Sequence, residues 1–455
     1  MILVSEARGE FLMVERIREE LSRLGRESLH VTASSDDASS AELARSGALA
    51  LDRHPAVRAA VDLPTARLAV ELERVERACG NVTLRRVWQA DLRSWRDHHG
   101  DDAMARAAIG YADAWREILG EAGEVAGLWG EEGGHLGKRM AFLAARAAGI
   151  PVWFVVFVPL PGRMLVLEDP LFRLSPEELA AVSPEPSERQ YAEEIVASVR
   201  ESRLQFATPR SLAFHPRRLT RFASLVARRA RNAEPGAKSL YPLTFARLYT
   251  RQRAVSAVLK RAYREPGSAP FVFFPIHYRT DAQITIRAPQ WENQLALIEL
   301  LSDSLPYGFE LMIKEHPYEP GGMPAAGLLA LLRRRRNIRL LPPTIHSHQI
   351  LRDAAALATV NSTVGYEALF YGVPVVTLGN GPYRGLGLTY DVVDPFDLPQ
   401  ALWDAVHGPP ARPDGVLALI TLLHRRSFPG RPLGYDVGDE NIRAYANMFA
   451  ALAAL

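Results

Sequence analysis

The stretch ALATVNSTVGYEALFYGVPVVTLG, residues 356–379, has the pattern of a strand, a helix and a second strand. Residues 356–362 are a short apolar run that ends in polar residues, residues 363–372 are helical in composition and end at a glycine, and residues 373–379 are apolar and β-branched. Two strands joined by a helix run parallel, because a parallel pair needs a long crossover connection. The stretch therefore predicts a parallel α/β sheet that is buried on both faces.

The same alternation extends to both sides of this stretch and recurs in the first part of the chain. In the second half, further strands are predicted at residues 271–277, 309–317 and 337–343, with helices at residues 293–305 and 327–336 between them. In the first half, strands are predicted at residues 1–5, 28–34, 82–89, 124–130 and 149–158. Two Rossmann-like halves with a cleft between them are the simplest architecture for this order.

Four segments follow from the change of composition along the chain. Residues 1–170 are predicted to form an N-terminal Rossmann-like domain, and residues 171–265, rich in Arg, Pro and Ser, a helical connector. Residues 266–410 are predicted to form a C-terminal Rossmann-like domain. Residues 411–455 are expected to be a helical tail that packs back on the domains.

Composition and charge exclude several classes of function. The chain has 455 residues, with 54 Lys and Arg against 52 Asp and Glu, which gives a net charge of +2. This balance excludes a nucleic-acid binder that works through bulk charge. The single cysteine, Cys79, excludes an internal disulfide and a cysteine zinc site. The N-terminus does not resemble a signal peptide, and the longest apolar run, residues 149–162, is too short for a membrane helix, so we expect a cytoplasmic protein.

Polar residues follow the predicted strands of the second half, where ligands bind in open α/β sheets. The first group, in PIHYRTDAQ, contains His277, Arg279 and Asp281. An imidazole, a guanidinium and a carboxylate in one loop could hold a phosphate and carry out acid–base chemistry. A loop held together by its own ion pairs is an equally good interpretation of this group alone.

The second group is KEHP, at the end of the predicted strand FELMI. Pro317 ends the strand and favours an extended conformation for His316. His316 could donate a hydrogen bond to a phosphate oxygen, and Lys314 would add positive charge. The dipeptide His-Pro is common, so the interpretation depends on its position after a buried strand.

The third group lies where a strand becomes a helix. Asn361, Ser362 and Thr363 could cap the helix or hold a phosphate at its N-terminus, and these two roles are compatible. Glu367 follows Thr363 by four residues and is therefore expected on the same helix face. The glycine-rich loop GNGPYRGLGLTYD, residues 379–391, could close over a ligand, but it has neither a P-loop nor a dinucleotide-binding pattern.

In the first half, the loop WGEEGGH, residues 129–135, also follows a predicted strand. Glu131 and Glu132 could act as acid–base groups, or they could be solvated loop carboxylates. No metal site is expected, because no D-x-D pattern stands at a strand end and no other metal-binding pattern occurs. The basic tract of residues 333–336 could contact an anionic membrane, although a solvated helix face is the favoured interpretation.

Three blocks of this sequence resemble a known family. FVFFPIHYRTDAQ, LPYGFELMIKEHP and ATVNSTVGYEALFYGVPVVTLGNGPYRGLGLT occur in this order within residues 265–400. Together they resemble the capsular polysaccharide biosynthesis glycosyltransferases, a group that includes the Kdo transferases of capsule assembly. The N-terminal half is similar to this family only in pattern.

The resemblance implies an α/β fold of the GT-B type, with two Rossmann-like domains facing a cleft, a helical connector and C-terminal helices. It implies a metal-independent glycosyltransferase without a bound cofactor, which takes a sugar from a nucleotide-sugar donor, such as CMP-Kdo or a similar CMP-sugar. The acceptor would be a cell-surface polysaccharide or a glycolipid, and the latter would favour peripheral contact with the inner membrane face.

The resemblance also implies roles for the residues singled out above. His316 would contact the donor phosphate, Ser362 and Thr363 would bind phosphate, and Glu367 would help to hold the nucleotide. In the first block the family usually has Gln-x-acid, whereas this chain has Arg279 and Asp281. Asp281 is our candidate for the catalytic carboxylate, with Glu131 or Glu132 in reserve, and the donor-binding set is His277, Arg279, Lys314, His316, Asn361, Ser362, Thr363 and Glu367.

Two other functions stay open at this point. A polyol-phosphate transferase with a CDP-activated donor would share the His-Pro loop and the architecture. A non-catalytic scaffold of a capsule assembly complex would explain the Arg279 departure and the absence of an acid after the strand of residues 149–158.

Overall fold

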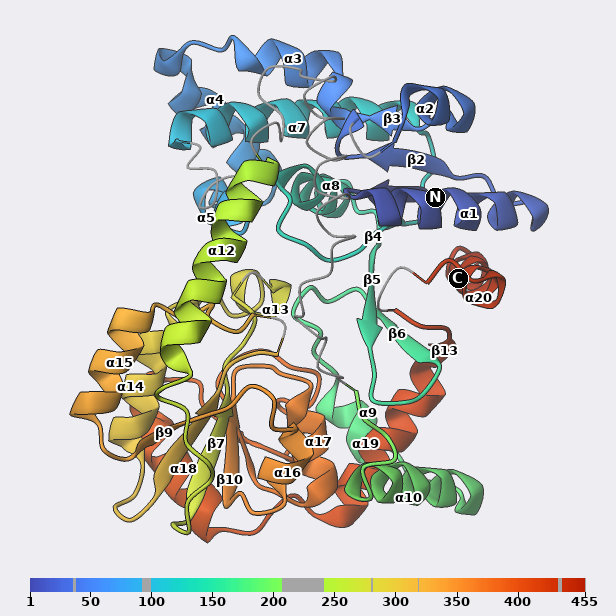
Figure 1. Cartoon of the computed structure of the whole chain (residues 1–455). Coiled ribbons are helices and arrows are strands. Elements are labelled where there is room, and N and C mark those ends of the chain that lie inside the picture. The colour runs from blue at the N-terminus through green and yellow to red at the C-terminus, as the bar shows by residue number, and fades with distance from the viewer. Residues whose placement is uncertain are drawn as a thin grey trace. The chain divides into compact units, whose positions relative to one another are not determined.

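A computed structural model describes residues 1–35, 38–91, 100–206, 241–279, 281–317, 319–432 and 436–454. Its contacts divide the chain into two compact units. Unit 1 contains Tyr241 and the described residues of 1–170 and 426–455, and unit 2 contains those of 171–206 and 242–425. Each unit is built around its own sheet (Figure 1).

The sheet of unit 1 has the strand order β13-β6-β5-β4-β1-β2-β3. Its first five strands in the chain are parallel, and β6 and β13 add an antiparallel edge. The strands are β1 (Ile2–Ser5), β2 (Leu29–Thr32), β3 (Leu49–Ala50), β4 (Leu128–Gly130), β5 (Val152–Phe157), β6 (Arg163–Leu167) and β13 (Ser427–Pro429).

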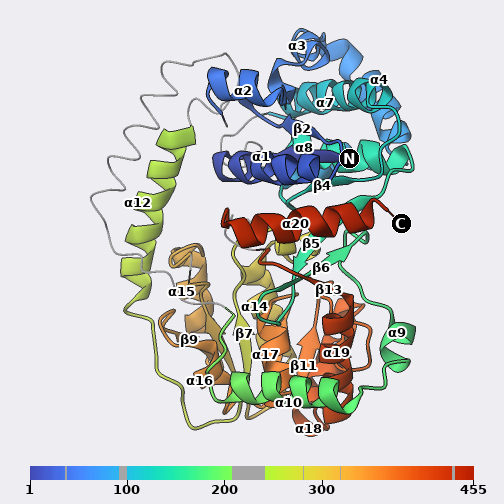
Figure 2. The same cartoon turned by 90° about the vertical axis from the view of Figure 1, so that its right-hand side faces the viewer.

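Helices cover both faces of this sheet. On one face α1 lies beside α20 (Figure 2), and on the other α8 packs against α7, which contacts α3, α4 and α5. The helices are α1 (Arg8–Arg23), α2 (Ser40–Ser46), α3 (Pro55–Val61), α4 (Thr65–Ala78), α5 (Leu84–Gln89), α7 (Asp101–Glu121), α8 (Leu136–Ala147) and α20 (Asp439–Leu452). Side chains of α1, α20 and the sheet share one apolar cluster, in which Phe449 stacks on Trp153.

The sheet of unit 2 is parallel throughout, in the order β12-β11-β10-β7-β8-β9. The central strands β7, β10 and β11 are buried along their whole length, as expected for a parallel sheet that is covered on both faces. The strands are β7 (Phe271–Pro275), β8 (Glu310–Lys314), β9 (Ile338–Leu341), β10 (Ala356–Thr359), β11 (Val375–Thr377) and β12 (Tyr390–Asp391).

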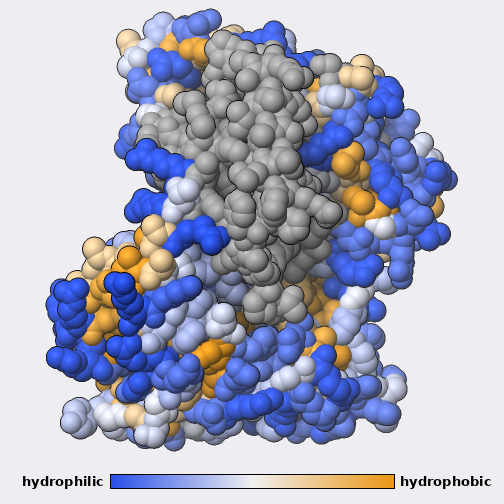
Figure 3. Space-filling view, in the orientation of Figure 1, coloured by the Kyte–Doolittle hydropathy of each residue, from blue (hydrophilic) through white to orange (hydrophobic). Residues whose placement is uncertain are grey.

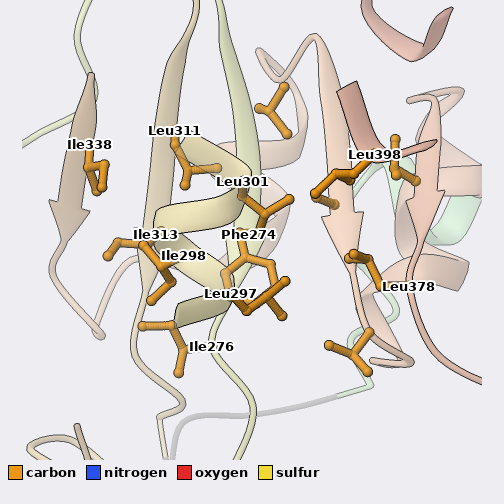
Figure 4. Packing of buried hydrophobic residues seen from close by; sticks show 14 of the residues in the cluster. Phe274, Ile276, Leu297, Ile298, Leu301, Leu311, Ile313, Ile338, Leu378 and Leu398 are labelled. Atoms are coloured by element: carbon orange, nitrogen blue, oxygen red, sulfur yellow. The ribbon is translucent and has the colours of Figure 1, made fainter. Parts of the chain in front are cut away.

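In unit 2, α14 contacts α15 and α18 on one side, and α17 contacts α16 and α10. The helices are α9 (Pro176–Ala180), α10 (Pro186–Arg200), α12 (Tyr241–Leu259), α13 (Ala282–Thr285), α14 (Gln294–Ser304), α15 (Ala325–Arg334), α16 (Ser347–Leu351), α17 (Val364–Tyr371), α18 (Leu398–His407) and α19 (Pro413–Arg426). The core lies between the sheet and α14, where Phe274, Leu297 and Leu301 interdigitate (Figure 4). This core fixes the carboxyl ends of the strands.

The predicted α/β class with two Rossmann-like domains is confirmed. The predicted strand at residues 82–89 is wrong: Leu84–Gln89 is the helix α5, because Leu84, Val87 and Trp88 share one buried face at helical spacing. The predicted helical tail contains the strand β13 between α19 and α20. Residues 207–240 of the predicted helical connector lie outside the described residues.

The predicted connector and the predicted C-terminal tail are divided between the two units. The first part of the proposed connector, up to Phe206, belongs to unit 2, where Arg200 donates to the Phe370 carbonyl of α17 at 2.6 Å. The proposed tail is shared, since α19 up to Arg425 belongs to unit 2 and α20 to unit 1.

Candidate functional site in unit 2

A pocket of roughly 710 Å³, including open solvent at its mouth, lies at the carboxyl ends of the strands of unit 2. The strand order reverses direction between β7 and β10: β8 and β9 lie on one side of β7, and β10 and β11 lie on the other. Loops that leave neighbouring strands in opposite directions open a crevice, which is where open α/β sheets bind ligands. The lining residues are Pro275, Ile276, His277, Tyr278, Asp281, Gln283, Lys314, Glu315, His316, Pro317, Pro343, Ile345, His346, Ser347, Ser362, Thr363 and Val364.

His277 is buried directly after β7 and fixes the floor of the pocket. Its backbone N–H donates to Gln294 Oε1 at 2.7 Å, and its carbonyl accepts from Gln294 Nε2 at 3.0 Å. Its Nε2 accepts from the backbone N–H of Asn361 at 3.4 Å, which links the loops after β7 and β10. Burial, with the nearby His316 and Arg287, lowers the pKa of His277 to about 3. The imidazole is therefore neutral at pH 7 and acts as an acceptor at Nε2.

Asp281 lines the pocket at the start of α13. Its carboxylate caps this helix by accepting from the backbone N–H of Gln283 at 2.9 Å. Burial raises the pKa of Asp281, although the Gln283 hydrogen bond and Arg287 oppose the shift. Asn361 Nδ2 donates to the Gln283 carbonyl at 2.6 Å and so holds α13 beside the end of β10.

Lys314, the last residue of β8, is 5% exposed and contacts two neutral oxygens. Its Nζ donates to the Ile345 carbonyl and to Ser347 Oγ, both at 3.0 Å. Burial lowers the pKa of Lys314 to about 8, and the Glu367 carboxylate opposes this effect. Lys314 is therefore a cation at pH 7 whose charge is only weakly compensated by its contacts.

His316 lies two residues further on and lines the same pocket, as strand alternation requires. Burial and the Lys314 charge lower the pKa of His316 to about 4. Its ring centroid is 5.9 Å from that of Tyr278. Glu315 between them is held elsewhere, because its carboxylate accepts from Tyr263 at 2.8 Å and from the Gly321 N–H at 2.9 Å.

Ser362 and Thr363 bring the N-terminus of α17 to the pocket. The Ser362 N–H donates to Thr359 Oγ1 at 3.1 Å, and Ser362 Oγ accepts from the Val364 N–H at 3.3 Å. Thr363, at the N-cap, makes no side-chain capping hydrogen bond. The helix end therefore offers a partial positive charge and hydroxyl donors to an anion.

Three of the predicted donor-binding residues, Asn361, Glu367 and Arg279, do not line this pocket. Glu367 is 3% exposed and lies beside His348, with 3.5 Å between Oε1 and Nε2. Arg279 lines a smaller adjoining pocket of about 220 Å³, and its backbone N–H donates to Glu319 Oε2 at 2.9 Å. The structure thus brings His277, Asp281, Lys314, His316, Ser362 and Thr363 together, with Asn361 directly behind them.

Glu131 and Glu132 follow β4 in unit 1. The Glu131 carbonyl accepts from Lys138 Nζ at 2.7 Å, and the same nitrogen lies 2.9 Å from Glu10 Oε1 and 3.5 Å from Glu6 Oε2. Glu131 and Glu132 are both partly exposed. They stay candidates for acid–base chemistry, and the buried ion network beside Glu131 has no signal in the sequence.

The glycines of this loop allow close packing. A Cβ on Gly133 would lie 3.0 Å from Glu6 Oε1, and one on Gly134 would lie 2.0 Å from the Ala90 carbonyl oxygen. The glycine-rich sequence is therefore required by contacts inside unit 1.

Several pocket residues carry no signal in the sequence. Ile345, in the loop after β9, and Ser347, the first residue of α16, accept hydrogen bonds from Lys314. No local signal marks them, since their role depends on β8 and β9 being neighbours. Glu315 also lines the pocket, although strand alternation alone would turn it away from Lys314 and His316.

No group of three or more His, Cys, Asp or Glu side chains that could hold a metal ion occurs among the described residues. No helix in the described part of the chain is long and apolar enough to cross a membrane.

On the face shown in Figure 3, hydrophilic residues predominate and apolar residues form small separate areas. In the basic tract, Arg334 pairs with Glu299 at 3.0 Å and Arg335 with Asp303 at 2.6 Å.

Comparison with known proteins extends the resemblance seen in the sequence. Residues 207–402 match the family model described as capsule polysaccharide biosynthesis protein. Protein FixF of Sinorhizobium fredii is 29% identical over 128 residues, 28% of this chain and 30% of FixF. The capsule polysaccharide export protein KpsS of Escherichia coli is 34% identical over 83 residues, 18% of this chain and 21% of KpsS.

The matched stretches thus span less than a third of either relative. Among solved structures, the KpsC beta Kdo 2,4 transferase of Thermosulfurimonas dismutans is similar, with 14% identity and a TM-score of 0.38 over 72% of this chain and 87% of that one. At this level the likeness carries no information on activity. The predicted resemblance to capsule polysaccharide biosynthesis proteins is confirmed over residues 207–402.

Proposed function

We propose that this chain is a glycosyltransferase of capsule polysaccharide biosynthesis, which transfers a sugar from a nucleotide-activated donor to a cell-surface polysaccharide or glycolipid. The observation that carries the proposal is the pocket after β7, β8 and β10, where Lys314, His316 and the N-terminus of α17 face one space. These residues lie inside the stretch that matches the family model.

The charge of the pocket supports a donor with one phosphate group. Lys314 is the one Lys or Arg among the described lining residues, and the two neighbouring imidazoles are neutral at pH 7. One ammonium group and one helix N-terminus match the single negative charge of a phosphodiester, as in CMP-Kdo or a similar CMP-sugar. A nucleoside diphosphate sugar would place a second negative charge in the same space.

During transfer, negative charge develops on the leaving phosphate as the bond to the sugar breaks. Lys314, the hydroxyls of Ser362 and Thr363 and the end of α17 would stabilise that charge. His316 would contact the phosphate as a hydrogen-bond donor. Asp281 would serve as the nucleophile or base, since it is the carboxylate of the pocket that approaches from the β7 loop.

The proposal does not require a metal ion. The two carboxylates that line the pocket already accept hydrogen bonds, Asp281 from the Gln283 N–H and Glu315 from Tyr263 and Gly321. Stabilisation of the phosphate would therefore come from Lys314 and the helix end.

The first experiment is a thermal-shift titration with CMP, CDP, UDP, GDP and ADP, with and without Mg²⁺. A ligand at about 100 times its dissociation constant adds about 2.7 kcal/mol to the free energy of unfolding, which raises the melting temperature by a few degrees. We expect a selective shift with CMP that does not depend on Mg²⁺.

Other outcomes separate the alternatives. A selective shift with another nucleotide would retain the transferase and exclude a CMP-sugar donor. A selective shift with CDP would point to a polyol-phosphate transferase, and the mass of the product would distinguish an added sugar from an added polyol phosphate. The absence of any shift would contradict the proposal and favour a non-catalytic scaffold.

A further inference from the structure

We infer that Tyr383 is a positioning residue that holds the phosphate-binding end of α17 in place, an inference that rests on the proposed function. Tyr383 does not line the pocket itself. It belongs to the glycine-rich loop after β11, whose role the sequence left open.

The hydroxyl of Tyr383 reaches the residue that joins β10 to α17. It donates to the Ser362 carbonyl oxygen at 2.7 Å, and the Tyr383 side chain is fully buried. The same carbonyl accepts from the Gly365 N–H at 2.9 Å. Since Ser362 and Thr363 line the pocket, the bond from Tyr383 fixes the backbone that presents their hydroxyls and the first amides of the helix.

The ring of Tyr383 occupies space that a side chain on α17 would need. A Cβ on Gly365 would lie 2.3 Å from Cζ and 2.4 Å from the hydroxyl oxygen of Tyr383. Glycine inside a helix costs about 1 kcal/mol relative to alanine. Gly365 is thus explained by the ring, which packs edge-on against Tyr366 with 5.1 Å between centroids.

The loop that carries Tyr383 is itself anchored. Arg384 donates to the Gly379 carbonyl at 2.8 Å and to the Val392 carbonyl at 2.9 Å. The Gly385 N–H donates to Asp391 Oδ2 at 2.8 Å, and Asn380 Nδ2 donates to the Arg287 carbonyl at 3.0 Å. These contacts support the loop beside the N-terminal end of α17.

Tyr366 provides a matched control within the same ring pair. Tyr366 is also buried, and its hydroxyl has no hydrogen-bond partner among the described residues. Tyr383→Phe and Tyr366→Phe each remove one buried hydroxyl and keep the ring. Only the first substitution removes a bond to Ser362.

The test is isothermal titration of the unaltered protein and both variants with CMP and with cytidine, or with the corresponding pair for the nucleotide that the protein selects. We expect Tyr383→Phe to weaken CMP binding about three- to tenfold, the effect of one hydrogen bond. Cytidine, which lacks the phosphate, should bind equally well to all three proteins. Tyr366→Phe should bind CMP within about twofold of the unaltered protein.

Three results would overturn the inference. CMP binding by Tyr383→Phe that equals that of Tyr366→Phe would show that the hydroxyl does not position the helix end. An equal loss of CMP and cytidine affinity would indicate a general structural role. If the unaltered protein bound no nucleotide at all, the proposed function itself would fail, and the inference with it.

Discussion

The two sheets have the same turning point, but the charges beside it are arranged differently. In unit 1 it lies between β1 and β4, where Lys138 is 1% exposed and contacts Glu10, Glu6 and the Glu131 carbonyl. In unit 2 it lies between β7 and β10, and Lys314, at the end of the neighbouring strand β8, donates hydrogen bonds to a carbonyl and a hydroxyl. The two sheets thus have similar topology, but the charge of Lys138 is neutralised by carboxylates of unit 1, whereas the charge of Lys314 is available to an anion.

The pKa values of the two lysines differ accordingly. Burial alone would lower the pKa of Lys138, but Glu10, Glu6 and Glu131 outweigh it and raise the pKa above its usual range. For Lys314 burial dominates and lowers the pKa to about 8. A buried cation with weak internal compensation is stabilised when an anionic ligand arrives, so the comparison favours unit 2 as the phosphate-binding side.

We expect the largest effect from a substitution that breaks the ion network of unit 1. Lys138→Met leaves Glu10 buried without its cation, and we expect a loss of about 3–5 kcal/mol in the free energy of unfolding. Urea denaturation at pH 7 measures it. Lys314→Met is the matched control, and it should change stability by much less because the Lys314 ammonium forms no ion pair with a carboxylate among the described residues. Equal losses in the two variants would remove the distinction between the lysines.

The next largest effect is expected from substitutions that test which unit supplies the catalytic carboxylate. Asp281→Asn should lower the turnover rate about 100-fold or more, as expected for a group that acts on the reacting atoms. Glu131→Gln and Glu132→Gln should lower it by much less. Turnover is measured with the donor identified by titration, at saturating donor. A greater loss in either unit 1 variant would move the catalytic role to unit 1.

The smallest effect concerns the pH dependence of nucleotide binding. The pKa of Lys314 is about 8, so the free protein loses this positive charge as pH rises through 8. The affinity for CMP should therefore fall roughly fivefold between pH 8 and pH 9, where the CMP phosphate itself no longer titrates. Titration calorimetry across this range measures the change. Lys314→Met should bind weakly with no such dependence, and a parallel decline in this variant would assign the effect to another group.

Much of the fold and part of the site could be predicted because the signals are local. Strands such as β7 and β8 are short apolar runs, and polar residues at their carboxyl ends, such as His277 and Lys314, could be placed at one edge before any contact was known. The spacing of Glu367 from Thr363 suggested a shared face of α17. In the structure Glu367 is covered by His348 of α16, an arrangement that depends on tertiary packing.

Other features depend on residues far apart in the chain. Tyr383 contacts a residue 21 positions away, and Ser347 contacts Lys314 across 33 positions. Neither contact has a periodicity or a motif that a sequence would show. The helix α5 was mispredicted because its β-branched and aromatic residues, Val87 and Trp88, also suit a strand.

The way in which unit 1 is completed has a consequence for biosynthesis. The strand β13 forms one edge of its sheet. Tyr445 and Phe449 of α20 pack against Trp129 of β4, in the apolar cluster that α20 shares with α1 and the sheet. During translation, the residues of β13 and α20 are therefore made only after all of unit 2, and until then this apolar surface of unit 1 has no cover. The unit that is made first is finished last, and in that interval its exposed surface is a natural substrate for chaperones.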